Sequence, residues 1–550
     1  MIGILLFWFA FSLVPLVPVK HSPSHQEQLQ QGKEPPVEQR KDVVNNAAAN
    51  KIRDYCNRKL QQKGSVNIQL AHVYSARDFQ PLWTNRMMIA QLIGAVEESF
   101  NDGLDPSDYH LSEIRGLYNN PPADPEQEAR YDLLLSEVFL TLAGHLHYGK
   151  VDPESLDPHW NITALRSRKV LEERLHYAID SRQIALVLKE LRPRHTKYEE
   201  LRKWLARYRV IAREGGWPVI ADGSKLQEGS RDRRIPMLRK RLTVLSESKV
   251  TGEDTSTVYN REMVDAVRRF QKLNNIDADG VVGAATLHVM NIPVERRIEQ
   301  IRLNLERYRW FLSDVEPTCV MVNIAGFSLE YVENGHYRWE TRVIVGQPSR
   351  KTPVFRANMQ YIIINPQWVI PPTILAKDAL PALRKSSSWL NKKKLKVIDR
   401  SGHVVQPESV NWSQYSAANF PYRLQQTAGD HGALGRIKFL LPNRYIIYLH
   451  DTPNKELFEK SRRTFSSGCI RVENPADLAE LVLQDKGRWS RSQILDAINK
   501  GKTLTVALQK QIPVYILYLT AVAKGDELLF PDDVYNLDGN VLKALNKPVH

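Results

Sequence analysis

The stretch that decides the fold class runs Tyr445-Ile-Ile-Tyr-Leu-His450-Asp-Thr-Pro and continues, after a short gap, as Ser466-Ser-Gly-Cys469-Ile-Arg-Val. The apolar run predicts a strand from Arg444 to Leu449 that His450 ends. The following Asn474-Pro475-Ala-Asp pattern predicts a helix start, with Asn as N-cap and Pro in the first helical position. Cys469, 19 positions after His450, is therefore expected on a loop between a strand and a helix.

A cysteine on such a loop is a candidate nucleophile. Attack on an amide carbonyl needs a thiolate, and a nearby imidazole can take the thiol proton and hold a thiolate–imidazolium pair. Cys469 is therefore a candidate nucleophile and His450 a candidate general base, which would later return a proton to the leaving amine. Taken alone, a single cysteine is more often a small core residue, and the flanking pattern is what favours catalysis. Backbone N–H groups of Gly468 and Cys469 are candidate oxyanion donors, each contributing about 3 kcal/mol.

The pattern around the pair resembles the YkuD-type L,D-transpeptidase catalytic domain, whose signature is His, a gap, then [Ser/Thr]-x-Gly-Cys. Ser466-Ser-Gly-Cys469 fits this signature, and Ile364-Asn-Pro-Gln-Trp and Gly429-Asp-His-Gly-Ala match further parts of the family. Two positions depart from it: Ser467 stands where the family often has a second His, and Arg471 where it often has Asn. His450 is thus the only candidate base in the motif.

Further residues are assigned to the substrate. Tyr448 shares a strand face with His450, because side chains two apart on a strand point the same way. Trp368, before Pro371-Pro372, is expected either to cover the stem peptide or to pack in the core. Ser467 and Arg471 complete the predicted substrate-binding set, and Arg471 either meets a substrate carboxylate or forms a structural ion pair.

Asp451 follows His450 directly and is expected to point away from the imidazole. A backbone carbonyl is the better candidate for orienting that ring.

The resemblance implies a reaction. A tetrapeptide stem of peptidoglycan is the donor, D-alanine leaves, Cys469 carries the acyl group, and the side-chain amine of a second stem resolves it into a 3→3 cross-link. Water or a lipoprotein lysine are alternative acceptors, wall-synthesis proteins are possible partners, and carbapenems are expected to acylate Cys469. No metal or cofactor is implied, and the sequence carries no motif for one.

The predicted fold is a multidomain α+β protein. A mostly β, sandwich-like YkuD-type domain with a lid is joined to an α-helical scaffold and a small three-helix peptidoglycan-binding-like domain, as in the large YcbB-type branch. The wall-binding resemblance rests on Ala266-Val-Arg-Arg-Phe-Gln and Asp279-Gly-Val-Val-Gly-Ala-Ala-Thr286. The expected segments are a signal peptide or anchor (1–20), flexible linker (21–50), scaffold (51–232), peptidoglycan-binding-like domain (233–292), connecting helix (293–314), catalytic domain (315–505, with the lid at about 370–440) and a C-terminal segment packing on the scaffold (506–550).

Composition and charge bound the function classes. The 550 residues are 42% hydrophobic and 25% charged, as in globular proteins, and the net charge of +14 fits either an acidic polymer partner or a generally basic surface. No basic tail or zinc-finger spacing points to nucleic acid. Three cysteines cannot all pair within one chain, and Cys56 and Cys319 are expected to be unpaired. The apolar run from Ile2 to Val19 predicts export to the periplasm, either with a cleaved signal or with an inner-membrane anchor.

Two other function classes stay open. An exported cysteine peptidase or amidase, such as an L,D-carboxypeptidase, would use the same thiolate, but wall hydrolases of the NlpC/P60 kind place Cys before His in the chain. A non-catalytic wall-binding protein would need no thiol at all.

Overall fold

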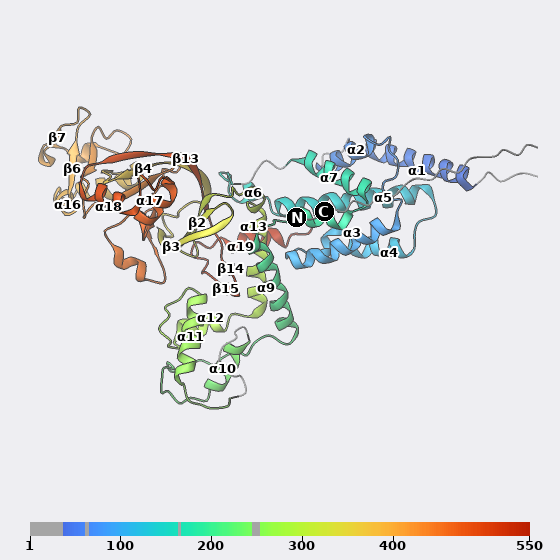
Figure 1. Ribbon diagram of the computed structural model, residues 1–550, viewed down its shortest axis with the longest axis horizontal. Coiled ribbons are helices and arrows are strands. Elements are labelled where there is room, and N and C mark those ends of the chain that lie inside the picture. The colour runs from blue at the N-terminus through green and yellow to red at the C-terminus, as the bar shows by residue number, and fades with distance from the viewer. Residues whose placement is uncertain (1–36, 61–64, 163–166, 245–253, 550) are drawn as a thin grey trace, which may run out of the picture.

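The computed structural model describes residues 37–60, 65–162, 167–244 and 254–549. It has three lobes that meet around two central helices, α9 (Thr196–Arg213) and α13 (Val294–Arg309) (Figure 1). A helical lobe lies on one side of these helices, a β-rich lobe on the other, and a small helical unit at one end of α9 and α13. The predicted α+β class is confirmed. The predicted segment 1–20 lies outside the described residues.

The helical lobe buries one continuous apolar core. Its longest helix, α5, starts at the N-cap Asp124, whose carboxylate accepts from the N–H groups of Glu126 and Gln127, with Pro125 in the first helical position. Leu135, Leu142 and Leu146 of α5 are fully buried. The lobe's principal helices are α1 (Val37–Leu60), α2 (Ser65–Ser75), α3 (Arg86–Glu98), α4 (Leu111–Asn119), α5 (Pro125–Tyr148), α6 (Pro153–Leu156), α7 (Arg168–Ser181) and α8 (Ile184–Glu190).

The flexible linker predicted for residues 21–50 is wrong where the structure describes it. Residues 37–50 belong to helix α1. Ala48, Ala49, Ile52 and Cys56 are buried, with Ile52 and Cys56 in the scaffold core. Alanine has the highest helix propensity, and tertiary packing stabilises a helix that composition alone does not reveal.

The small unit contains α10 (Ile235–Thr243), α11 (Arg261–Leu273) and α12 (Ala284–Met290) around a core of its own. Buried Gln271, the last residue of the Phe-Gln motif, fixes the Asp-Gly turn. Its amide donates to Asp279 Oδ1 (2.8 Å) and Thr286 Oγ1 (3.1 Å), while its carbonyl accepts the Gly280 N–H (2.8 Å). Gly280 has φ +78° and no room for a Cβ, so the motif residues have a structural role.

Helices α9 and α13 bind the lobes together through a buried polar network. Asp102, fully buried, pairs with Arg192 and accepts from the Tyr198 hydroxyl, while Arg309 of α13 donates to the Asp102 carbonyl. Arg309 also pairs with Glu306 at 2.6 Å. Because each charge has a partner, the network fixes the relative position of scaffold and connecting helix.

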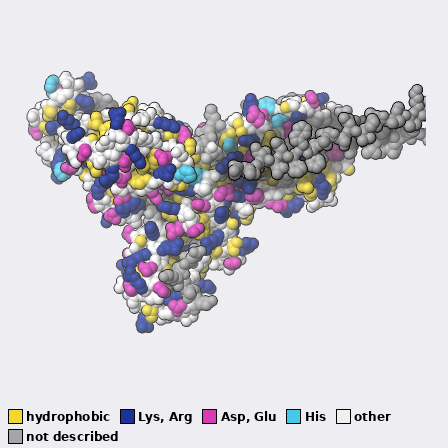
Figure 2. Space-filling model, viewed as in Figure 1, with side chains coloured by type: hydrophobic (Ala, Val, Ile, Leu, Met, Phe, Trp, Pro, Cys, Tyr) yellow, Lys and Arg dark blue, Asp and Glu magenta, His cyan; other side chains and the backbone are white. Residues whose placement is uncertain are grey.

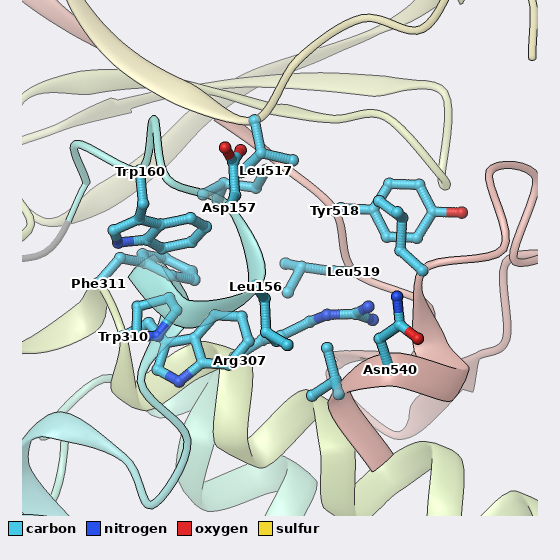
Figure 3. Close-up of a pocket in the computed structure, with 14 residues that line it drawn as sticks. Leu156, Asp157, Trp160, Arg307, Trp310, Phe311, Leu517, Tyr518, Leu519 and Asn540 are labelled. Atoms are coloured by element: carbon cyan, nitrogen blue, oxygen red, sulfur yellow. The ribbon is translucent and has the colours of Figure 1, made fainter. Parts of the chain in front are cut away.

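A cavity of about 220 Å³ lies at the same junction (Figure 3). Trp160 from the loop after α6, Trp310 and Phe311 after α13, and Leu517 and Leu519 of the β-rich lobe line it. Trp160 and Trp310 meet edge to face at 5.3 Å. Three parts of the chain thus share one aromatic contact region.

The β-rich lobe is built on a nine-stranded sheet in the order β11-β3-β12-β10-β9-β4-β13-β1-β2. Strand β3 (His336–Gly346) pairs with β2 up to Arg342 and with β12 and β11 through its last residues, so it passes from one end of the sheet to the other. The sheet therefore closes on itself around an apolar core. The other strands are β1 (Cys319–Asn323), β2 (Ser328–Glu333), β4 (Phe355–Ile364), β9 (Ile437–Leu440), β10 (Leu449–His450), β11 (Thr464–Ser466), β12 (Ile470–Val472) and β13 (Leu504–Leu517), with α17 (Pro475–Leu483) and α18 (Arg491–Asn499) beside them.

The predicted end of the catalytic domain at residue 505 is wrong. Strand β13 crosses this position and pairs antiparallel with β4 and parallel with β1, in the middle of the sheet. The chain then forms the hairpin β14 (Val522–Lys524) and β15 (Glu527–Leu529) and the helix α19 (Asp538–Leu545). Val541 and Leu545 of α19 join the scaffold core. The final residues thus tie the two large lobes together.

The predicted strand 444–449 is also mostly absent. Only Leu449 and His450 form β10, because Asn443 turns the chain before them: its side chain accepts from the Tyr445 and Ile447 N–H groups. Ile446 has φ +58°, outside the strand region.

The lid is a folded subdomain rather than an irregular stretch. It has its own four-stranded sheet and its own apolar core. Leu380, Leu390 and Val397 are buried in this core. The predicted end of the lid at about residue 440 is too late, because β9 at 437–440 pairs with β4 in the main sheet. The lid contains β5 (Trp368–Val369), α14 (Pro372–Ile374), a π-helical turn (Leu375–Ala379), α15 (Leu380–Leu383), α16 (Ser388–Lys392), β6 (Leu395–Ile398), β7 (Val404–Val405) and β8 (Arg423–Gln426).

Lysine and arginine side chains are spread over the face shown in Figure 2 and mixed with acidic ones. Cys56 and Cys319 are free and buried, which confirms the expectation that they are unpaired. Within the described ranges, the helices are all too short or too polar to cross a bilayer.

Candidate active site

The loop that carries Cys469 is held by its neighbours' hydroxyl groups. Ser466 Oγ donates to the Cys469 carbonyl (2.6 Å) and accepts the Gly468 N–H (3.1 Å). Thr352 Oγ1 donates to the Gly468 carbonyl at 2.7 Å. Gly468 has φ +121°, a conformation in which a side chain would be strained. This tight turn presents the half-buried Cys469 to a cavity.

The Gly468 N–H, one of the two predicted oxyanion donors, donates to Ser466 Oγ in this structure. Within the part of the chain that the structure describes, the N–H of Cys469 makes no hydrogen bond. The second predicted donor is therefore the one available to a substrate oxygen.

His450 is oriented by a backbone carbonyl. Its Nδ1 lies 2.5 Å from the carbonyl oxygen of Asp451, and the ring is 5% exposed. The Asp451 carboxylate points elsewhere, since it accepts the Arg436 N–H (2.8 Å) and pairs with Lys455 (2.5 Å). A backbone hydrogen bond to Leu434 also acts on the ring. A neutral imidazole that donates from Nδ1 has an unprotonated Nε2 that can accept a proton. Both expectations about Asp451 are confirmed.

Tyr448 lies beside Cys469 across the parallel pair of β10 and β12. In this pairing Leu449 is opposite Ile470, and the Ile470 N–H donates to the Tyr448 carbonyl at 3.1 Å. Hydrogen bonds from the backbone and side chain of Tyr448 favour the Cys469 thiolate and act to lower the thiol pKa. The Trp368 side chain also hydrogen-bonds Tyr448, so Tyr448 joins the lid to the thiol.

Arg471 and Lys438 flank the site on β12 and β9. His450 is opposite Arg471 on one side and opposite Lys438 on the other. Among the described residues Arg471 has no carboxylate within 4.0 Å, so the alternative of a structural ion pair is not realised. The Lys438 ammonium lies 3.8 Å from the centre of the Tyr448 ring. Burial lowers the pKa of both cations, and each interacts favourably with the Cys469 thiolate.

Burial favours the neutral form of both the thiol and the imidazole. Burial raises the pKa of the Cys469 thiol, although Tyr448, Lys438 and Arg471 act in the opposite direction. Burial, together with the positive charge of Arg471, lowers the pKa of His450 to about 3. Within the described residues no hydrogen bond joins the two side chains, and Cys469 Sγ lies 4.0 Å from the Ile446 carbonyl oxygen. Burial therefore opposes formation of the thiolate–imidazolium pair, which the neighbouring cations and Tyr448 favour on the thiolate side.

One cavity of about 780 Å³ brings these groups together. All of the predicted site residues except Gly468 line it: Trp368, Tyr448, His450, Ser467, Cys469 and Arg471. The lid supplies the opposite wall, including Lys392, Lys393 and Lys394. With Arg471 these lysines make the cavity positive, which suits a ligand that carries carboxylates.

The lid is fastened to the catalytic loop by a bidentate ion pair. Arg350 contacts both carboxylate oxygens of Asp378 at 2.6 Å, and its Nη1 also donates to Ser467 Oγ at 3.1 Å. Asp378 lies in the π-helical turn of the lid. Arg350, Asp378 and Lys438 were not predicted as site residues, because their positions follow only from strand pairing and lid folding. Ser466 was part of the quoted motif, but its role in holding the loop was not predicted.

Three family models match separate parts of the chain. Residues 317–515 match the L,D-transpeptidase catalytic domain (YkuD), residues 232–290 a peptidoglycan-binding domain, and residues 68–205 a scaffold domain. A curated protein of Haemophilus influenzae, named "Putative L,D-transpeptidase", is 31% identical over 289 residues. That match covers 52% of this chain and 57% of the relative, so the chain spans little more than half of the relative's length.

A solved L,D-transpeptidase structure from Xylanimonas cellulosilytica also matches. It is 13% identical, with 54% of this chain and 99% of that chain covered, at a TM-score of 0.17. A score this low supports no argument about fold or function.

Proposed function

We propose that this chain, in which residues 317–515 are a YkuD-type L,D-transpeptidase catalytic domain, forms 3→3 cross-links between peptidoglycan stems through an acyl-enzyme on Cys469. One observation supports the proposal most: Cys469, His450 and the unpaired Arg471 line a single positive cavity under a lid. A peptide with free carboxylates fits such a cavity, and the thiol and imidazole supply acyl transfer.

In the acylation step, Cys469 Sγ attacks the carbonyl carbon of the third stem residue while its proton passes to Nε2 of His450. Because both groups start neutral, this proton transfer accompanies attack rather than preceding it. The Cys469 N–H donates to the oxyanion. The C–N bond to the terminal D-alanine then breaks, and His450 protonates the leaving amine, which leaves a thioester on Cys469.

In the second step, the side-chain amine of an acceptor stem attacks the thioester carbon and gives its proton to His450. The C–S bond breaks, the thiol recovers the proton, and the new amide is the 3→3 cross-link. Attack by water instead would give L,D-carboxypeptidase activity on the same acyl-enzyme. A lid that limits water favours the amine, which is why transpeptidation is the preferred proposal.

Arg471 and the lid lysines would hold the carboxylates of the donor stem, and Trp368 and Ser467 would line its path. An exported, periplasmic location belongs to the same proposal and rests on the apolar residues 2–19. Acylation by carbapenems and contact with wall-synthesis proteins follow from the family resemblance.

The decisive experiment incubates purified protein with a disaccharide tetrapeptide and analyses the products by mass spectrometry. A cross-linked dimer with loss of one D-alanine is the expected product, and the Cys469→Ala variant should give none. Shortened monomers without dimer would identify a carboxypeptidase. Full biological effect of the Cys469→Ala variant, with no mass gain of the intact protein in a carbapenem, would identify a non-catalytic binding protein.

A further inference from the structure

A third cavity lies away from Cys469, between the peptidoglycan-binding-like unit, the two central helices and the hairpin β14–β15. It has a volume of about 80 Å³. Its walls are aromatic, with Trp204 and Tyr208 from α9, Trp217, Phe270 from α11, and Phe530 after β15. The Tyr208 ring meets Trp217 at 5.8 Å and Phe530 at 5.7 Å. This cavity shares no lining residue with the cavity of Cys469.

Two arginines of this cavity are buried without a carboxylate. Arg241 of α10 is 3% exposed and Arg297 of α13 is 6% exposed. Among the described residues neither has an acidic oxygen within 4.0 Å, whereas buried Arg309 and Arg307 pair with Glu306 and Asp538 at 2.6 Å. Unpaired charges at this depth are costly, and proteins normally neutralise them.

The contacts that the two guanidinium groups do make are neutral. Arg241 Nε donates to the Met290 carbonyl at 3.0 Å, and its guanidinium carbon lies 4.0 Å from the centre of the Trp217 ring. The two Nη groups of Arg241 have no hydrogen-bond partner in the described chain. Burial lowers the pKa of Arg241 to about 10, against an opposing effect of Tyr208 and with a smaller contribution from the charge of Arg297. Aromatic faces offset only part of such a desolvation cost.

Arg297 is satisfied in the same neutral way. Its Nη1 donates to Gln300 Oε1 and its Nη2 to Asn274 Oδ1, both at 2.8 Å, and its guanidinium carbon lies 4.3 Å from the Phe530 ring centre. Burial lowers its pKa to about 10 as well. The hydroxyl of Tyr208, whose side chain also lines this cavity, makes no hydrogen bond within the described residues. The Nη groups of Arg241 and the Tyr208 hydroxyl therefore face this space without an acceptor, beside Arg297, whose charge interacts with Asp532 from beyond 4.0 Å.

The acidic groups of the cavity lie at its rim. Glu527 pairs with the half-exposed Arg269 at 3.2 Å, and Asp526 is exposed on the hairpin. The space is too small for a whole peptide and large enough for one carboxylate group. We propose that Arg241, Arg297 and the Tyr208 hydroxyl bind a carboxylate of a peptidoglycan stem peptide, at a site separate from the catalytic cavity.

The choice of ligand rests on the proposed function and on location. Arg241 and Phe270 are among the lining residues that belong to the unit matching a peptidoglycan-binding domain. Stem peptides end in free carboxylates, and a guanidinium pair is suited to bind such a group. A stem held here would keep a wall strand on the enzyme while another stem reacts at Cys469.

Calorimetric titration of the full-length Cys469→Ala variant with a disaccharide tetrapeptide tests the proposal without turnover. Two binding sites per chain are expected, and one should remain after Arg241→Met and Arg297→Met are added. Arg269→Met is the matched control, because Arg269 lines the same cavity but already has Glu527 as its partner, and it should keep both sites. Equal stoichiometry in the control and the double variant would overturn the proposal.

A second variant covers the case in which the double variant does not fold. Tyr208→Phe keeps the aromatic ring and removes one donor, so it should weaken the second site about 5- to 10-fold and leave the first unchanged. An unchanged second site would count against the proposal. Acetate is the third probe: if acetate binds and is lost in the double variant while the tetrapeptide shows one site throughout, the cavity is a simple anion site and the stem-peptide assignment fails.

The two proposals fail separately. Absence of cross-linked product from the wild-type enzyme would refute the proposed function, whatever the calorimetry shows. Absence of a second site in the Cys469→Ala protein would refute only the carboxylate site.

Discussion

Tyr448 lies next to Cys469 across two paired strands and hydrogen-bonds its thiol, while the Trp368 side chain from the lid hydrogen-bonds Tyr448. The phenol therefore connects the lid with the sulfur that we propose to be acylated. It also lies above Lys438, whose ammonium is 3.8 Å from its ring. Loss of this hydroxyl removes a contact to the charged form of the thiol without altering the strand pairing.

The Tyr448→Phe variant should acylate about 10- to 100-fold more slowly, because a hydrogen bond to a charged group contributes about 1.5–3 kcal/mol. Intact-mass spectrometry over a time course with a carbapenem measures the rate. Tyr361→Phe is the control, since Tyr361 lies on β4 with its side chain 38% exposed. Equal rates for wild type and Tyr448→Phe would show that the hydroxyl does not assist the thiolate.

Alkylation of Cys469 by iodoacetamide should be slow at neutral pH. Burial raises the thiol pKa, so the reactive thiolate fraction grows about tenfold per pH unit and has not levelled off at pH 9. Cys56 and Cys319 do not interfere, because burial raises their pKa values to about 11 and about 12. The Cys469→Ala protein gives the background. A plateau below pH 8 would mean that a resting thiolate exists after all.

The buried neutral His450 should make the fold sensitive to acid. Its pKa is about 3 in the folded chain and about 6.5 when unfolded, so the unfolded state binds the extra proton between these values. The contribution to stability is present above pH 6.5 and is lost as the pH falls toward 3. Thermal unfolding of wild type and His450→Gln between pH 7 and pH 4 measures the difference. Parallel curves for the two proteins would contradict the assigned shift.

Breaking the ion pair between Arg350 and Asp378 should loosen the lid. Asp378→Asn removes one of the two acceptor oxygens and the negative charge, so only one uncharged hydrogen bond to Arg350 remains. Arg350 is then less firmly held in the position from which it donates to Ser467. Faster limited proteolysis within residues 370–426 and a higher KM are expected, with kcat less affected. The matched control is Asp399→Asn, since Asp399 lies elsewhere on the lid and faces only the exposed His403. Equal proteolysis of both variants would exclude the fastening role.

A chain truncated after Thr505 should not form a folded catalytic lobe. Strand β13 pairs with both β4 and β1, and its residues Val514 and Ile516 are fully buried in the core. A chain truncated after Leu529 keeps the strand and loses only the final segment with α19. Circular dichroism and solubility distinguish the two. A soluble, cooperatively unfolding product of the shorter chain would restore the boundary predicted from sequence.

Local signals in the sequence determined the local features. The Asn-Pro helix start, the Asp-Gly turn held by Gln271, and the Gly-Cys loop depend on neighbours in the chain, so pattern alone located them. His450 and Cys469 are only 19 positions apart, and the carbonyl that orients His450 belongs to the next residue, Asp451. The family resemblance extended this to the α+β class.

Only the tertiary structure decided what depends on distant segments. The sheet closes through β3 and receives β13 from beyond the predicted boundary, because hydrogen bonds between strands ignore distance along the chain. Arg350 meets Asp378, and Arg241 meets Arg297, only after the lobes fold against one another. Protonation is decided there too: burial raises the Cys469 pKa and lowers that of His450, and burial is a property of the whole packed chain.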